Sequence, residues 1–132
     1  MRGSVFLVED DADLLDLYEL ILEAEGFLIW DACRSGESAI RRYRTAADLP
    51  DAVVLDYRLP GCTGLEVART ILARDPTAAI IFATADDTAR EAAARLGVRR
   101  FKRKPFDTVR LIRNVAAAVA ERGACPAPGH RP

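Results

Sequence analysis

At residues 52–61 the chain reads AVVLDYRLPG, a short apolar run that ends in an acid and passes directly into a turn. Unbroken apolarity is typical of a strand that is covered on both faces of a sheet. Asp56 would then hold a carboxylate at the mouth of a buried strand, where a charge is unfavourable unless it has partners. We therefore expect neighbouring strands to supply partners for Asp56.

The rest of the chain repeats the same alternation of short apolar runs and longer amphipathic segments. We expect strands at 5–8, 27–33, 51–56, 79–83 and 98–104, separated and followed by helices. This alternation predicts repeated strand–helix units, a mostly parallel sheet and an α/β fold.

Two of the expected helices show their buried faces in the sequence. The first helix, which ends near Gly26, repeats apolar residues at helical spacing, and we expect its inner face to be Leu14, Leu17, Tyr18 and Ile21. The helix at 87–96 has an inner face of Ala89, Ala92, Ala93 and Leu96. Methyl groups bury little apolar area, so we expect this helix to be the most weakly anchored.

Composition limits the class of protein. A chain of 132 residues with a net charge of −1 fits one domain and shows no strongly basic field for nucleic acid. We expect residues 1–122 to form that domain and 123–132 to be a disordered Pro-rich tail. No apolar stretch approaches the roughly 20 residues that cross a bilayer, and no signal pattern opens the chain, so we expect a cytoplasmic location.

Cysteine and histidine usage excludes several kinds of site. The three cysteines, an odd number without a CxxC pair, suggest neither a disulfide framework nor a zinc site. The single histidine, His130, lies in the predicted tail, so no histidine is expected to act within the domain.

Polar residues stand at or just past the carboxyl ends of the predicted strands, and they are Glu9, Asp10, Asp56, Thr84 and Lys104. In open α/β sheets this edge is where ligands bind. Carboxylates are the hard oxygen ligands that Mg²⁺ prefers, and clustered carboxylates repel one another without a cation. The sequence predicts a Mg²⁺ site here, with Asp56 as a nucleophile toward phosphorus and with Thr84 and Lys104 as partners of the phosphoryl group.

Four segments carry a resemblance to a known family. FLVEDD at 6–11, VVLDYRLPG at 53–61, ATA at 83–85 and FKRKPF at 101–106 resemble the motifs of two-component response regulator receiver domains. The resemblance covers about residues 4–121, with the motifs in the right order and spacing. It implies a doubly wound, flavodoxin-like (βα)5 three-layer sandwich, whose parallel five-stranded sheet has the order 2-1-3-4-5.

The resemblance also implies a role for each site residue. Asp56 would be the phosphoacceptor and also a ligand of Mg²⁺. The ion would further be held by Asp10 directly, by Glu9 through water and by the backbone carbonyl of Arg58. Thr84 would meet the phosphoryl group as the switch hydroxyl. The remaining two roles would fall to Lys104, which pairs with a phosphoryl oxygen and precedes a cis bond to Pro105, and to Phe101, the aromatic switch residue.

Receivers of this kind are signalling domains rather than enzymes with a separate substrate. The resemblance implies a sensor histidine kinase or phosphotransfer protein as donor. An output partner would be contacted by the face that the helix at 87–96, the last strand and the closing helix form. A homodimer through the same face is left open, and direct binding to nucleic acid or membrane is not expected. The chain is either a stand-alone relay or a fragment of a longer regulator.

The last strand departs from the common receiver pattern. Lys102 falls where receivers usually place an apolar residue, and the whole run 99–104 is basic. We favour a solvated sheet edge that discourages pairing with other strands over a docking surface for an acidic partner.

Other functions fit less well. An aspartate-nucleophile phosphatase typically carries a second Asp two residues after the nucleophile, where this chain has Arg58. A flavin-binding electron carrier needs a first loop that cradles phosphate, and the acids at 9–11 would repel it. The remaining alternative is a degenerate receiver that acts as a phosphorylation-independent interaction module.

Overall fold

The computed structural model describes residues 2–84, 89–98, 100–103 and 108–124. For Thr84, residues 100–103, Gly123 and Ala124 it describes the backbone alone. The elements are β1 (Ser4–Val8), α1 (Ala12–Ala24), β2 (Leu28–Cys33), α2 (Gly36–Thr45), β3 (Ala52–Asp56), α3 (Gly64–Arg74), β4 (Ile80–Thr84), α4 (Ala89–Arg95), β5 (Arg100–Arg103) and α5 (Thr108–Ala124).

All five strands form one parallel sheet in the order β2-β1-β3-β4-β5. The predicted fold class and strand order are confirmed. β3 lies at the centre, and every one of its residues is buried, as its unbroken apolarity predicts. β5 lies at one edge of the sheet, the position that the solvated-edge interpretation of the basic run requires.

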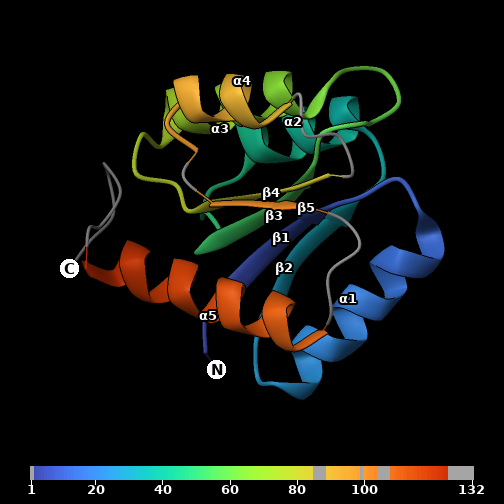
Figure 1. Cartoon of the computed structure of the whole chain (residues 1–132), viewed down its shortest axis with the longest axis vertical. Coiled ribbons are helices and arrows are strands. Elements are labelled where there is room, and N and C mark those ends of the chain that lie inside the picture. The colour runs from blue at the N-terminus through green and yellow to red at the C-terminus, as the bar shows by residue number, and fades with distance from the viewer. Residues whose placement is uncertain (1, 85–88, 99, 104–107, 125–132) are drawn as a thin grey trace.

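Helices cover both faces of the sheet. Figure 1 shows α2, α3 and α4 on one face and α1 and α5 on the other. Alternate residues of the strands point into two cores: Phe6 and Val53 pack under α2 and α3, whereas Val5 and Val54 pack under α1 and α5. This period of two is what a parallel strand covered on both faces requires.

Short polar residues cap the amino ends of the first three helices. Asp11 accepts hydrogen bonds from the backbone N–H groups of residues 13 and 14, and Ser35 and Thr63 cap α2 and α3 in the same way. Gly26 follows the end of α1 with φ +92, a conformation that residues with a side chain rarely adopt.

The inner face of α1 differs from the predicted one. Leu15, Tyr18 and Leu22 are buried, whereas Leu17 is 45% exposed. Large apolar residues lie on both sides of Tyr18 around the helix. Two overlapping sets of residues therefore have helical spacing: the expected set and the set that is buried. Packing against the sheet and α5 selects one of them.

A buried ion cluster lies at the amino end of the sheet, opposite the predicted site. The Arg122 guanidinium pairs with the fully buried Asp75 and lies 3.7 Å from Asp51 through Nε. Asp51 also accepts the backbone N–H of Ser4 at 2.9 Å, and Asp75 accepts that of Thr77 at 3.1 Å. One cation thereby joins the last turn of α5 to the C-cap of α3 and, through Asp51, to the starts of β1 and β3.

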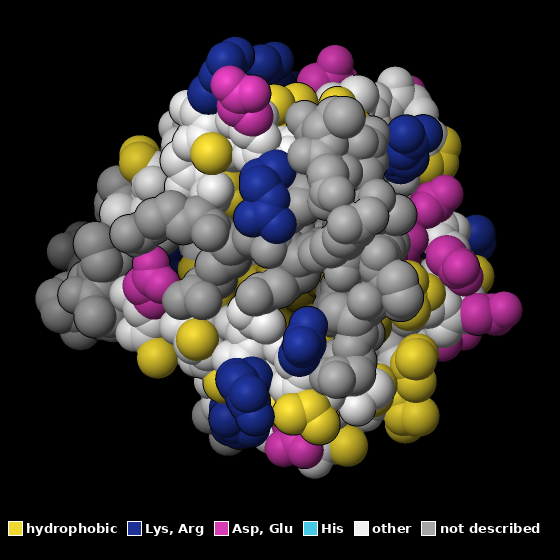
Figure 2. All heavy atoms as spheres, in the orientation of Figure 1, with side chains coloured by type: hydrophobic (Ala, Val, Ile, Leu, Met, Phe, Trp, Pro, Cys, Tyr) yellow, Lys and Arg dark blue, Asp and Glu magenta, His cyan; other side chains and the backbone are white. Residues whose placement is uncertain are grey.

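The far end of the chain differs slightly from the predicted boundary. Helix α5 continues through Gly123 and Ala124, which were expected in the tail. The rest of the tail, residues 125–132, lies outside the described residues. None of the described helices is long and apolar enough to span a membrane. On the face shown in Figure 2, basic and acidic side chains are interspersed over the described surface.

Candidate functional site

The sheet register brings the acids at the ends of β1 and β3 together. Val8 pairs with Leu55, so the next residues along the two strands, Glu9 and Asp56, lie side by side at the carboxyl edge. The Glu9 N–H continues the ladder on the other side by donating to the Cys33 carbonyl at 3.0 Å. The backbone pairing of the strands alone is thus enough to bring these two carboxylates to the same edge.

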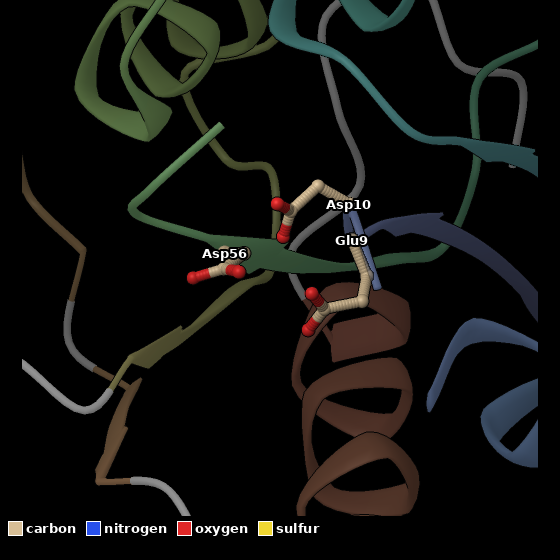
Figure 3. A group of neighbouring side chains, drawn as sticks. All are labelled: Glu9, Asp10 and Asp56. Carbon is tan, nitrogen blue, oxygen red and sulfur yellow. The ribbon is translucent and has the colours of Figure 1, made fainter. Parts of the chain in front are cut away.

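Three carboxylates converge at this edge. Glu9, Asp10 and Asp56 each offer an oxygen, and these oxygens lie within 4.8 Å of one another. Figure 3 shows the side chains coming from the adjacent ends of β1 and β3 around a common space. Glu9 is 3% exposed and Asp56 is 7% exposed, while Asp10 is exposed at the lip. Buried carboxylates in this number call for a compensating positive charge.

Backbone N–H groups donate hydrogen bonds to two of these carboxylates. The Arg58 N–H donates to Asp56 Oδ1 at 3.3 Å, and the Asp11 N–H donates to Glu9 Oε2 at 3.1 Å. Both bonds run from a residue two positions later, so each acid is held by the turn that follows its own strand. These short turns orient the carboxylates without neutralising them.

An open hollow lies beside Asp10, one of the three acids. Its lining is Asp10, Tyr57, Arg58, Leu59, Pro60 and Thr63, so it lies between the loops that follow β1 and β3. The hollow opens to solvent beside the edge of the sheet where β3 ends in Asp56.

The residues fit a hard divalent cation. Mg²⁺ binds carboxylate, carbonyl and water oxygens and is usually held by one or two carboxylates. Within the described residues, Glu9, Asp10 and Asp56 supply such carboxylates together. Arg58, two residues after Asp56 on the following loop, offers a backbone carbonyl oxygen as a further ligand.

The other predicted site residues lie partly outside the described structure. Thr84 ends β4 at the same edge, since Asp56 pairs with Ala83, but its side chain is not described. Phe101 lies in β5 opposite Phe82, again with the backbone alone described. Lys104 and the Lys104–Pro105 bond fall outside the described residues, so their predicted roles stay predictions.

Two residues that the sequence did not single out lie against the site. Gly64 packs so closely that a Cβ there would stand 2.3 Å from the Asp56 carbonyl oxygen. Arg34 donates from Nε and Nη2 to the backbone carbonyl of Asp10, at 3.2 and 3.0 Å. The position of Gly64 at the start of a helix was predictable, whereas nothing local in the sequence marks Arg34.

Comparison with known proteins identifies the family. The family model of the response regulator receiver domain matches residues 5–116, and the chain therefore belongs to the response regulator receiver family. This is a signalling domain of two-component systems, in which phosphorylation and Mg²⁺ are typical.

Similar curated proteins are transcriptional regulators. The chain is 35% identical over 121 residues to the phosphate regulon transcriptional regulatory protein PhoB of Rhizobium meliloti, covering 89% of this chain and 52% of the relative. It is 31% identical over 119 residues to the alkaline phosphatase synthesis transcriptional regulatory protein SphR of Synechococcus elongatus, covering 83% of this chain and 46% of the relative. The chain thus spans about half the length of these relatives.

A similar solved structure carries a metal. The receiver domain of the sensor histidine kinase PA1611 from Pseudomonas aeruginosa has a magnesium ion coordinated in its active site cleft. It shares 26% sequence identity with this chain at a TM-score of 0.78, covering 89% of this chain and 98% of that one.

Proposed function

We propose that Asp56 accepts a phosphoryl group from the phosphohistidine of a sensor histidine kinase or phosphotransfer protein, in a Mg²⁺-dependent reaction. The observation that carries this proposal is the convergence of the Glu9, Asp10 and Asp56 carboxylates within 4.8 Å. Membership of the receiver family and the magnesium ion in a similar receiver support it.

Asp10 and Asp56 would bind the cation directly, Glu9 would hold it through water, and the Arg58 carbonyl would complete the protein ligands. When bound, Mg²⁺ supplies positive charge to the phosphoryl oxygens and offsets the charge of the three acids. Phosphoryl transfer depends mainly on this kind of positioning and charge neutralisation.

The transfer step itself falls to Asp56. One Oδ forms a bond to phosphorus while the bond from phosphorus to the donor imidazole nitrogen breaks, leaving an acyl phosphate and a free histidine. Thr84 would donate its hydroxyl to a phosphoryl oxygen, and Lys104 would pair with another. In this proposal Asp56 promotes its own modification and the slow loss of the group, without a separate substrate.

Phosphorylation would be read through α4, β5 and α5. The described buried side chains of α4 are the methyl groups of Ala89 and Ala93, so little apolar area holds this helix. Movement of Thr84 toward the phosphoryl group, followed by Phe101, would change this face for an output partner. A second copy of the chain is one candidate partner, and the site would operate in the cytoplasm.

Incubation with acetyl phosphate and Mg²⁺, followed by intact-mass spectrometry, tests the phosphoacceptor. We expect the wild type to gain one phosphoryl increment. We expect no increment when Mg²⁺ is chelated before the incubation, and none in Asp56→Asn. Asp13→Asn serves as a control because Asp13 is exposed on the first turn of α1 and lies outside the acidic cluster.

The competing function is a degenerate receiver that binds partners without phosphorylation. A phosphoryl increment on Asp56 would exclude it. Circular dichroism of the same sample shows whether it is folded. If folded wild type acquires no phosphoryl group in any divalent cation, the degenerate-receiver function is favoured and our proposal is overturned.

A further inference from the structure

The loop that carries Asp10 is held at three consecutive residues, each by a different contact. The Glu9 N–H pairs with β2 at 3.0 Å, and the Asp11 side chain caps α1 by accepting two backbone N–H groups at 3.0 and 3.2 Å. Between them, the Asp10 carbonyl accepts both Nε and Nη2 of Arg34.

Arg34 is itself placed by the fold. It follows Cys33, the last residue of β2, and precedes Ser35, the N-cap of α2. β2 is the immediate neighbour of β1 in the sheet, so a side chain leaving the end of β2 reaches the loop after β1. Because guanidinium is planar, two donors on one carbonyl fix the orientation of the peptide group, which a lysine ammonium cannot do.

We propose that Arg34 is a positioning residue, whose paired hydrogen bonds to the Asp10 carbonyl hold the Asp10 carboxylate against Glu9 and Asp56 for cation binding. Fixing the peptide plane after Asp10 fixes the direction in which its side chain leaves the backbone. The inference rests on the proposed Mg²⁺ site and adds a residue to it that no receiver motif in the sequence includes.

The charge of Arg34 acts in the opposite direction. A guanidinium beside the acidic cluster repels an incoming cation, although solvent and salt screen this effect at an exposed position. A purely electrostatic Arg34 would therefore weaken cation binding, so its removal would tighten binding. A positioning Arg34 gives the reverse result, and this difference in sign separates the two roles.

The test is titration of the metal-free full chain with Mn²⁺, followed by the electron paramagnetic resonance signal of the free ion. We expect Arg34→Met and Arg34→Lys both to weaken binding by about tenfold, the lower end of the range for residues that orient metal ligands. The control is Arg2→Met: Arg2 also donates to a backbone carbonyl, that of Glu25 at 3.4 Å, but at the other end of the sheet.

Amide hydrogen exchange in metal-free protein gives a second readout, which does not depend on phosphorylation. We expect faster exchange at residues 9–11 in both Arg34 variants and unchanged exchange in β3. If the wild type binds Mn²⁺ and both variants bind it equally well or more tightly, the positioning role is wrong while the metal site stands. A wild type that binds no Mn²⁺ would overturn the metal site and the positioning role together.

Discussion

Asp56 keeps its carboxylate at the end of β3 with 7% of its surface exposed. The Arg58 N–H supplies one hydrogen bond, and the nearby Glu9 and Asp10 add negative charge rather than compensate it. A cation bound among these three carboxylates would offset part of their negative charge. We therefore expect Mg²⁺ to reduce the electrostatic cost of holding the Asp56 carboxylate at this position.

Tyr43 is also buried. This burial, with a smaller effect from the nearby Asp75 carboxylate, raises the pKa of the Tyr43 hydroxyl to about 12. The unfolded phenol loses its proton near pH 10, so between these values the unfolded state binds fewer protons. The free energy of unfolding should therefore fall as pH rises, by about 1.4 kcal/mol from Tyr43 at about pH 11.

Urea unfolding followed by circular dichroism between about pH 9 and about pH 11 measures this effect, and Tyr43→Phe is the control. The variant lacks the ionisable hydroxyl, so its stability should decline less over that range. Identical pH slopes for the two proteins would contradict the assignment.

The element scale begins with the contact between α3 and β3. Gly64 opens α3 directly on the backbone of Asp56 and Tyr57, where an added Cβ would meet the Asp56 carbonyl oxygen at 2.3 Å and the Tyr57 Cα at 2.8 Å. Its N–H donates to the Tyr57 carbonyl at 2.7 Å. The helix therefore sets the position of the strand end that carries Asp56.

Gly64→Ala should lower the free energy of unfolding by about 1–3 kcal/mol, since the clash is with backbone and cannot be relieved by a rotamer change. It should also weaken Mn²⁺ binding, because the end of β3 must move. Gly97→Ala is the control: Gly97 has φ +91 and open space around a Cβ, so alanine there strains the backbone far from the acids. Unchanged Mn²⁺ affinity in Gly64→Ala would contradict the positional role of Gly64.

Helix α5 is joined to the end of α3 by the pair between Arg122 and Asp75, both nearly free of solvent. Removing one partner leaves an uncompensated buried charge, so Arg122→Met and Asp75→Asn should each lower the free energy of unfolding by about 3–5 kcal/mol. The double variant should lose less than the sum of the two, by at least about 1 kcal/mol.

The exposed pair of Arg95 and Glu91 on α4, at 2.7 Å, is the matched comparison. Solvent screens it, so Arg95→Met should change the free energy of unfolding by less than about 0.5 kcal/mol. Additive losses in the Arg122 and Asp75 cycle would show that the two side chains do not stabilise the fold as a pair.

At the scale of the whole molecule, the carboxyl edge of the sheet is acidic, and the opposite edge carries the compensated Arg122 cluster. A ligand that binds only the folded state stabilises it in proportion to the logarithm of its concentration. Mg²⁺ at ten times its Kd should therefore raise the free energy of unfolding by about 1.4 kcal/mol.

Thermal unfolding with and without Mg²⁺ measures this shift, and chelation should reverse it. Asp56→Asn and Asp10→Asn should each reduce the shift, whereas Asp13→Asn should not, because Asp13 lies on the first turn of α1 outside the acidic cluster. An equal shift in all four proteins would indicate a nonspecific ionic effect.

Phosphorylation should change the rate of amide hydrogen exchange most strongly in α4. The described inner face of this helix buries only alanine methyl groups at positions 89 and 93, while α1 and α3 bury leucine, isoleucine or valine side chains. Hydrogen exchange before and after treatment with acetyl phosphate and Mg²⁺ measures this. Changes of equal size in all helices would contradict the prediction.

Most of the fold could be predicted because its determinants are local and repeated. The unbroken apolar runs and the helical spacing between them are each visible within a few residues. The acids at the carboxyl ends of the strands were predictable for the same reason, since a parallel sheet brings those ends to one edge.

The sequence by itself determined the order of the elements, the fold class and the meeting of Glu9 and Asp10 with Asp56 at one edge of the sheet. Each of these follows from a local period or a short motif. Only the tertiary structure decided which leucines of α1 are buried, since two overlapping faces satisfy the same helical period. It alone joined Arg34 to Asp10 and Arg122 to Asp75, residues 24 and 47 positions apart. Such contacts depend on how separate elements are packed, and packing leaves no periodic signal along the chain.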